Sequence, residues 1–329
     1  MLHRIKVVPL ADESLGVRSM CTFVETPDVK LLLDAGVSLG PFRLGFPPHP
    51  REYKALKAAR KRIADAAEKT DVVTISHYHF DHHTPSYTDW FQNWSSDETA
   101  RQIYEGKIVL AKSYLDNVNF SQRHRGWVFA HTGGKYAERL EYVDGKEYTF
   151  GETLIRFSEP VVHGEQNSGL GWLIMTTIRH DNEQMLFTSD VQGPMHSGTM
   201  TAILNENPSI VIIGGPPAYL SGLVRQESIQ LGLKNLEEIA KSFPKTVLEH
   251  HILRQEDWRE LTRPMFETAA KAEHTVYTAA EFLKKENCLL EAKRKQLFET
   301  EPPSSEFRKW MRMPITKRKS TPPPIELIL

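Results

Sequence analysis

The feature that most constrains this chain is a cluster of histidine and aspartate residues directly after an apolar segment. Residues 71–76 read DVVTIS, a run that is typical of a buried strand, and the letters HYHFDHH follow at once. His77 and His79 are two positions apart, so at the end of an extended segment their side chains project to the same side. Asp81 and His82 come after the chain has turned, and they reach a second point nearby.

This combination of side chains predicts a metal site. Neutral imidazole and carboxylate groups together suit Zn, Fe or Mn. So many ionisable groups could not share a buried pocket unless cations neutralised them. The alternative is a solvated histidine-rich turn, which would explain a single histidine or a bare HxH pair. It explains the full cluster poorly, because the preceding strand delivers these residues into the fold.

The rest of the composition is that of an ordinary globular chain. The 329 residues carry a net charge of −1, so no overall positive field favours nonspecific binding of nucleic acid. Cys21 and Cys288 are far apart and neither belongs to a CxxC pair, so both are expected to be ordinary thiols. No apolar stretch has the length of a signal peptide or of the roughly 20 residues that a membrane helix needs. We therefore expect a cytoplasmic protein without a membrane partner.

The predicted elements begin as a β meander, not as a βαβ dinucleotide-binding unit. Strands are predicted at residues 5–9, 21–25, 30–34, 71–76, 107–111, 141–143, 153–157, 171–177, 185–188, 209–213 and 246–248. Amphipathic helices are predicted at about residues 50–69 and 226–242. Residues 262–291 are predicted to be helical with a break near Pro264, and residues 117–126 to be polar and irregular.

The segment SHYHFDH, residues 76–82, resembles the signature of the metallo-β-lactamase superfamily. Other landmarks of the superfamily follow in the expected order: LLDAG at 32–36, PVVHG at 160–164, FTSD at 187–190 and VLEHH at 247–251. Together they cover roughly residues 20–255. The whole sequence also resembles an archaeal branch whose members are described mostly as uncharacterised metal-dependent hydrolases. The resemblance implies an α/β (α+β) fold, the four-layer αββα metallo-β-lactamase sandwich.

The resemblance also implies a set of ligands for two divalent metal ions. The first ion would be bound by His77, His79 and His163, the second by Asp81, His82 and His250, and Asp190 would bridge them. Asp34 would hold these ligands in orientation through hydrogen bonds. Zinc is the expected metal, with manganese or iron as alternatives.

Three of these assignments have alternatives. His163 could be a loop histidine with ordinary hydrogen bonds, although a β-like run ends on it. Asp190 could cap a turn. His250 and His251 compete for one position, because strand alternation lets only one of them face the site. The Leu-x-His-x-x-x-Arg frame that ends at Arg254 resembles phosphodiesterases of the superfamily and favours His250 over His251.

The predicted function is metal-dependent hydrolysis. Two metal ions would lower the pKa of a bridging water so that hydroxide exists near neutral pH, and Asp81 would orient this nucleophile or relay its proton. A phosphodiester, in a nucleotide or a nucleic acid, is the favoured substrate, because the first motif contains an Asp, the third has the form VxHG, and Arg254 could pair with phosphate. One alternative is a lactone or thioester hydrolase of small molecules. Another is a di-iron redox or metal-binding protein without hydrolytic turnover.

We expect one hydrolase domain at residues 1–300, followed by a Pro-rich basic tail at residues 301–329. The sequence leaves open the natural substrate, the identity of the metal, the role of the tail and whether the chain forms a homo-oligomer.

Overall fold

The computed structural model describes residues 3–165, 169–220 and 222–325, which form two large β-sheets and one small one. The strands of the first sheet are β1 (Lys6–Asp12), β2 (Met20–Glu25), β3 (Lys30–Leu33), β4 (Val72–Ile75), β5 (Ile108–Ala111) and β6 (Arg139–Tyr142). Those of the second sheet are β7 (Glu147–Phe150), β8 (Thr153–Phe157), β11 (Thr176–His180), β12 (Glu183–Phe187), β13 (Ile210–Gly214), β14 (Lys245–Glu249) and β15 (Thr275–Tyr277). The small sheet pairs β9 (Val161–Val162) with β10 (Trp172–Leu173). The strand order is β1-β2-β3-β4-β5-β6 in the first sheet and β15-β14-β13-β12-β11-β8-β7 in the second.

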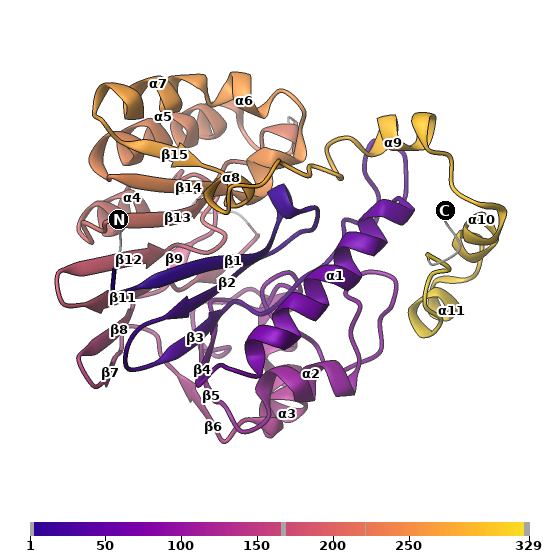
Figure 1. Cartoon of the computed structure of the whole chain (residues 1–329), viewed down its shortest axis with the longest axis horizontal. Helices are drawn as coiled ribbons and strands as arrows, with labels where there is room; N and C mark the ends of the chain where they lie inside the picture. Colours follow the sequence, from indigo (N-terminus) through magenta and orange to yellow (C-terminus); the bar gives the residue numbers. More distant parts are fainter. Residues whose placement is uncertain (1–2, 166–168, 221, 326–329) are drawn as a thin grey trace.

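Helices cover the outer faces of both sheets (Figure 1). The α-helices are α1 (Pro50–Ala67), α2 (Asp97–Tyr104), α3 (Phe120–His131), α4 (Ser197–Leu204), α5 (Gln226–Ser242), α6 (Trp258–Leu261), α7 (Arg263–Lys271), α8 (Ala279–Phe282), α9 (Arg294–Thr300), α10 (Ser305–Met311) and α11 (Ile315–Ser320). Short 3₁₀ turns are η1 (Glu13–Leu15), η2 (Gly133–Tyr136), η3 (Ala218–Leu220) and η4 (His250–Arg254). The helices α1, α2 and α3 lie beside the first sheet, and α5 and α7 beside the second.

Alternation along the buried strands builds the layers. Leu31 and Leu33 of β3 belong to the same buried cluster as Phe187 of β12 in the other sheet, whereas Leu32 belongs to the cluster that contains Leu56 of α1. Successive side chains of a strand point to opposite faces, so a strand that is apolar on both faces can join a helix layer to a sheet layer. The same arrangement recurs in the second sheet, whose outer face packs against α5 and α7. The predicted four-layer αββα sandwich is confirmed.

Two segments differ from their sequence-based predictions. Residues 117–126, predicted to be irregular, contain the first half of α3, whose N-terminus is capped by the Asn119 side chain accepting a hydrogen bond from the Gln122 amide at 2.7 Å. Residues 262–291, predicted to be helical with a break near Pro264, contain the helices α7 and α8 but also β15, which pairs in parallel with β14. Both errors arose because capping and strand pairing outweigh the apolar periodicity of a short segment.

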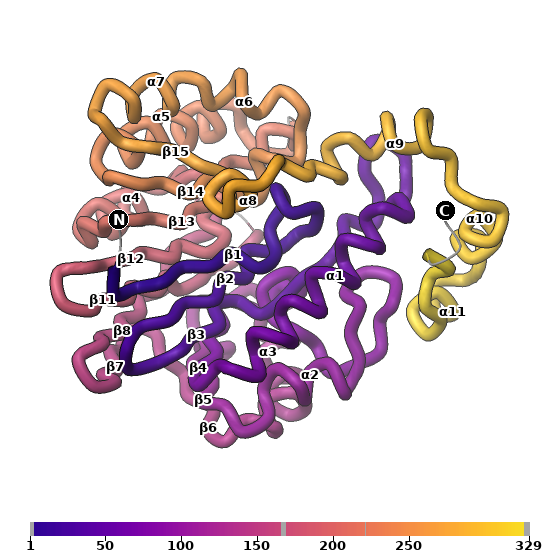
Figure 2. The backbone as a smooth tube through the Cα atoms, viewed as in Figure 1, coloured from indigo at the N-terminus to yellow at the C-terminus, as the bar shows by residue number. Residues whose placement is uncertain are grey.

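The C-terminal segment crosses from the second sheet to the far side of α1 (Figure 2). There Phe307 and Trp310 are buried, and their ring centroids lie 5.7 Å and 5.4 Å from that of Tyr53 on α1. These contacts tie α10 to the first helical layer. The domain boundary at residue 300 stays a prediction, and residues 326–329 of the predicted tail lie outside the described residues.

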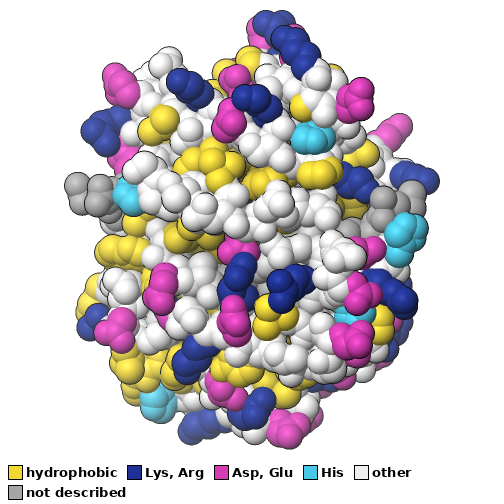
Figure 3. Space-filling view, turned by 90° about the vertical axis from the view of Figure 1, so that its left-hand side faces the viewer, with side chains coloured by type: hydrophobic (Ala, Val, Ile, Leu, Met, Phe, Trp, Pro, Cys, Tyr) yellow, Lys and Arg dark blue, Asp and Glu magenta, His cyan; other side chains and the backbone are white. Residues whose placement is uncertain are grey.

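The surface carries both signs of charge. On the face shown in Figure 3, Lys and Arg side chains are interspersed with Asp and Glu, and hydrophobic side chains lie between them. This face therefore offers no broad basic surface of the kind that nonspecific nucleic-acid binding requires. Within the described part of the chain, no helix has both the length and the apolar character required to cross a bilayer.

Candidate metal centre

The loop after β4 is held in place by Asp34, the residue that follows β3. Asp34 is fully buried, and its Oδ1 accepts a hydrogen bond from the Ser76 amide at 2.8 Å. Its Oδ2 accepts from the Ser76 hydroxyl at 2.6 Å, from His82 Nδ1 at 2.9 Å and from the Ser189 hydroxyl at 2.5 Å. One carboxylate therefore connects the histidine loop of the first sheet with the segment after β12 of the second.

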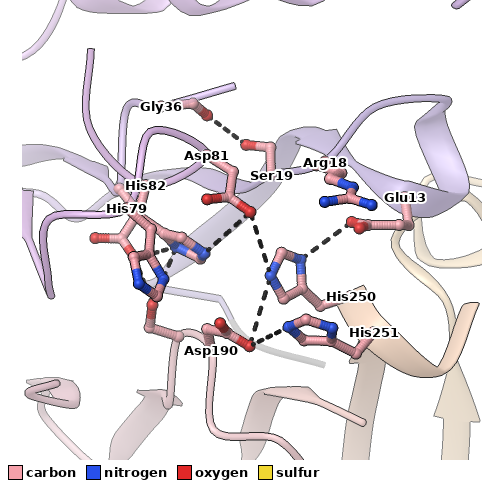
Figure 4. A network of polar contacts seen from close by, with 12 residues as sticks. Glu13, Arg18, Ser19, Gly36, His79, Asp81, His82, Asp190, His250 and His251 are labelled. Atoms are coloured by element: carbon pink, nitrogen blue, oxygen red, sulfur yellow. Dashed lines mark hydrogen bonds and ion pairs between the residues drawn. The ribbon is translucent and has the colours of Figure 1, made fainter. Parts of the chain in front are cut away.

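The turn after β3 approaches the histidine loop so closely that only glycine fits. A Cβ atom on Gly36 would lie 2.3 Å from the amide nitrogen of His83 and 2.4 Å from that of His82. The carbonyl of Gly36 accepts a hydrogen bond from the Ser19 hydroxyl at 2.6 Å (Figure 4). This close backbone contact fixes the end of the histidine loop.

A first group of potential ligands consists of three imidazoles and one carboxylate. One ligand atom from each of His77, His79, His163 and Asp190 lies within 4.8 Å of every other. The imidazole of His163 is oriented by its Nδ1, which donates to the carbonyl of Asp190 at 3.0 Å. The structure brings together all three histidines that the resemblance assigns to one ion.

A second group lies beside the first. Ligand atoms of Asp81, His82 and His250 lie within 4.8 Å of one another. The Nε2 of His250 is 3.6 Å from Asp81 Oδ2 and 3.5 Å from Asp190 Oδ1 (Figure 4). Asp190 therefore contacts residues of both groups, which is the position expected of a bridging ligand.

Both His250 and His251 face the centre, contrary to the expectation that only one of them could. The Nε2 of His251 lies 3.3 Å from Asp190 Oδ1, close to the corresponding distance for His250. Strand alternation does not apply here, because β14 ends at Glu249 and both histidines belong to η4. Their roles nevertheless differ, since only His250 joins the group of Asp81 and His82, while His251 joins Asp190 and His250.

The donor atoms fit divalent cations. His77 Nε2, His82 Nε2 and Asp190 Oδ1 are buried and have no hydrogen-bond partner in the structure. Buried polar atoms without partners are rare, because their desolvation is costly, and each one calls for an explanation. All three belong to the ligand groups, and nitrogen with carboxylate oxygen is the donor set that Zn, Mn and Fe prefer.

Electrostatics keep the imidazoles of His77 and His79 in the neutral form that binds metal. Burial, together with the neighbouring histidines, holds the pKa of His77 well below its usual range, and it lowers the pKa of His79 to about 3. Burial opposes the charge of Asp190 as well, but His251 and His250 outweigh it and hold the pKa of that carboxyl well below its usual range. Neutral imidazoles and an ionised carboxylate are the protonation states that metal coordination needs.

His250 is held by a buried partner that sequence reasoning missed. Glu13 of η1 accepts from His250 Nδ1 at 3.1 Å and from Arg254 Nε at 2.5 Å. Burial alone would lower the pKa of His250, but Glu13 and Asp190 outweigh it and raise the pKa to about 10. No local signal marks Glu13, because it is separated from His250 by 237 positions in the sequence.

The guanidinium of Arg254 belongs to this buried network. Its side chain is 2% exposed, its Nη1 lies 3.1 Å from the hydroxyl of Tyr219, and its Nη2 lies 3.9 Å from Asp81 Oδ2. With Glu13 as an ion-pair partner, Arg254 already has a role in positioning the centre. Its predicted contact with a substrate phosphate stays a prediction.

A second missed contact comes from α3. The side-chain nitrogen of Gln122 is 3.1 Å from His163 Nε2 and donates to the carbonyl of Leu170 at 2.9 Å. Gln122 is fully buried. The only sequence signal was Asn119, a favoured N-cap residue, which lies directly before the first residue of α3.

Comparison with solved structures agrees with this architecture. The chain is similar to the metallo-β-lactamase fold protein YhfI from Bacillus subtilis, with a TM-score of 0.52 and 14% identity over 84% of this chain and 97% of that one. It is also similar to CmlA, a diiron β-hydroxylase from Streptomyces venezuelae, with a TM-score of 0.51 and 11% identity over 84% of this chain and 53% of that one. The chain is therefore a metallo-β-lactamase-fold protein with a cluster of histidine and aspartate residues that can bind metal.

Sequence comparison narrows this class to one family. No family model matches the chain. It is 41% identical over 294 residues to a UPF0282 protein of Methanopyrus kandleri, covering 89% of this chain and 99% of that one. It is 42% identical over 298 residues to a UPF0282 protein of Thermococcus gammatolerans, covering 90% and 96%. The chain belongs to the UPF0282 family, and the resemblance to an archaeal branch is confirmed.

Proposed function

We propose that this protein is a hydrolase that uses two divalent metal ions, zinc being the first choice and manganese or iron the alternatives. The observation that carries the proposal is the position of Asp190, which belongs to one group of potential ligands with His77 and to another with His250. A carboxylate shared by two adjacent groups of imidazoles is suited to hold two cations close together.

The residues of the chain would divide the work of hydrolysis. Two bound ions would supply a nucleophilic water near neutral pH and polarise the bond under attack. Asp81 stays ionised, because His82 and His250 outweigh the effect of burial and hold its pKa below its usual range. As an ionised carboxylate that is 18% exposed, Asp81 can accept a hydrogen bond from the attacking water and orient it.

A phosphodiester is the substrate that we propose. Its support is the guanidinium of Arg254, which lies 3.9 Å from Asp81 Oδ2 and which, together with two bound metal ions, would attract the negative charge of a phosphate. The alternative substrates are a lactone or a thioester, whose carbonyl carbon the same water could attack. One of the similar structures is a diiron β-hydroxylase, so a di-iron redox protein is the third candidate function.

Metal analysis and a panel of chromogenic substrates test the proposal. We expect about two metal ions per chain and turnover of bis(4-nitrophenyl) phosphate, which His79→Ala should lower by about 100-fold or more. His180→Ala is the matched control, because His180 is buried in a separate contact with Thr153 and Asp28 at the far end of β11. Its activity should stay close to that of the unmodified protein.

The other outcomes separate the alternatives. If the protein hydrolyses lactones or thioesters but no phosphodiester, the proposed substrate is wrong and the proposed hydrolase activity stands. Bound iron with a visible absorption band and no hydrolysis of any ester would overturn the proposal in favour of redox chemistry. Location in the cytoplasm and assembly as a homo-oligomer stay predictions.

A further inference from the structure

The helix α3 is packed directly against the histidine loop. A Cβ atom on Gly126 would lie 2.8 Å from the ring of Tyr78 and 2.4 Å from the Cβ of Tyr114. A larger residue at this position would push the helix away, so glycine sets the distance between α3 and the loop. Tyr78 lies between the potential ligands His77 and His79 in the sequence. The packing therefore places one face of α3 at the metal centre.

Two polar residues, Gln122 and Arg125, lie on that face of α3. Gln122 and Arg125 are three positions apart and therefore neighbours on one side of the helix. Gln122 contacts His163 at 3.1 Å, as described above. The guanidinium carbon of Arg125 lies 4.6 Å from the ring centroid of Phe80, and Nη1 of Arg125 donates to the carbonyl of Tyr78 at 3.4 Å. Arg125 thus lies above the residue that separates His79 from Asp81.

The positive charge of Arg125 lacks a close counter-ion. Among the residues that the structure describes, none gives it a carboxylate within ion-pair distance. Burial lowers the pKa of this guanidinium, and the charge of Asp81 opposes that effect. Asp81 is chiefly compensated by others, since His82 and His250 do most to lower its pKa. An anion from outside would stabilise a partly buried guanidinium in this position.

A small pocket adjoins Arg125. It has a volume of about 90 Å³, and its walls include Phe80, His83, Tyr87, Val128 and Phe129. This volume is below the roughly 150 Å³ that holds a benzene ring, so the pocket fits a small apolar group or the edge of a ring. His83 donates its Nδ1 hydrogen to the carbonyl of His79 at 2.9 Å, which links the pocket wall to the ligand loop.

We propose that Arg125 and this pocket form a binding subsite for a second anionic group of the substrate, beside the bond that is hydrolysed. The substrate would carry a carboxylate or a phosphate that pairs with the guanidinium, next to a small apolar portion that packs against Phe80 and Tyr87. Arginine suits this role because its planar fork of donors matches both anions in a bidentate manner. The inference deepens the proposed function and rests on it, because Asp81 and His79 define where the reacting bond lies.

Equilibrium binding of simple phosphonates to the metal-loaded, full-length protein tests the subsite. The probes are ω-phosphonocarboxylates with one, two or three methylene groups, each compared with its uncharged carboxyl methyl ester by titration calorimetry. The phosphonate group would bind at the metal centre, and the carboxylate would pair with the guanidinium of Arg125. We expect at least one acid of the series to bind about 10-fold more tightly than its ester, as a charge-assisted hydrogen bond gives.

Three variants identify the residue that gives this preference. Arg125→Met should abolish the preference for the acid, and Arg125→Lys should restore part of it, because lysine keeps the charge without the fork. Arg123→Met is the matched control on the same helix, since Arg123 is exposed and donates to the carbonyl of Leu115. It should keep the full preference. The circular dichroism spectrum of each variant shows whether α3 stays folded.

The outcomes distinguish this inference from the proposed function. The subsite is refuted if no acid of the series binds better than its ester, or if Arg125→Met keeps the preference. Should the protein bind no phosphonate at all, the subsite fails too. The substrate panel then decides separately whether hydrolysis survives, because turnover of bis(4-nitrophenyl) phosphate does not need a second anionic group.

Discussion

Replacing Asp34 by Asn should weaken metal binding without unfolding the protein. The Oδ2 atom of Asp34 accepts hydrogen bonds from three donors, of which His82 Nδ1 at 2.9 Å is the one that orients a potential ligand. An Asn can turn an N–H toward this nitrogen, so two donors would face each other, or it can turn its oxygen there and lose the bond from the Ser76 amide. Hydrogen bonds to charged groups contribute about 1.5–3 kcal/mol each, so losing one should weaken metal binding by roughly 10- to 100-fold.

The backbone should tolerate this change. Asp34 has a φ of 48°, in the left-handed region, which Asn adopts as readily as Asp. The metal-free variant can therefore be titrated with Zn²⁺ against a chromophoric chelator and compared with the unmodified protein. Asp144→Asn is the control, because Asp144 accepts from Lys112 Nζ at 2.8 Å and from the Ser113 amide at 2.6 Å and lies outside both ligand groups. Equal zinc affinity for the Asp34→Asn variant and the unmodified protein would refute the role of this carboxylate.

Two further predictions concern buried carboxylates. Burial raises the pKa of Glu291, but the ion pair with Arg18 outweighs it and lowers the pKa to about 2, from an ordinary 4.5. This stabilisation is present above pH 4.5 and is lost as the pH falls through about 2, and it amounts to roughly 3 kcal/mol. Glu291→Gln should remove this part of the acid sensitivity in denaturant unfolding of metal-free protein, and an unchanged pH profile would contradict the assignment. Glu13→Gln should weaken the binding of one of two zinc equivalents by about 10-fold, because it removes the anion that orients His250, and equal loss of both equivalents would argue against so local an effect.

The part of the site that could be predicted lies in continuous sequence. The strand β4 and the ligands that follow it are neighbours in the chain, so alternation and the type of side chain were enough to predict a shared site for His77 and His79. The structure also brings Asp34 against the same loop, as the resemblance implied. Within these stretches the local pattern and the fold impose the same conformation, which makes the prediction reliable.

The missed parts depend on contacts between distant segments. Glu13 meets His250 across 237 positions, and nothing in the residues around Glu13 distinguishes it from a surface carboxylate. The helix α3 carries polar residues on the face that meets the centre, so it lacks the apolar stripe that predicts a helix. Gly126 allows this polar face to approach the histidine loop, and only the folded chain shows that approach. Functional faces break the apolar pattern, and sequence reasoning fails there for that reason.

The balance of charge supports two cations over one. Four carboxylates meet at the centre (Asp34, Asp81, Asp190 and Glu13), the guanidinium of Arg254 lies among them, and that of Arg125 lies at the edge, over Phe80. The imidazoles would be neutral when they bind metal, so two negative charges would stay uncompensated in a largely buried space. One divalent ion with a bound hydroxide would leave a negative centre that repels an anionic substrate. Two such ions with one hydroxide would leave one positive charge, which a phosphodiester, with its single negative charge, would neutralise on binding.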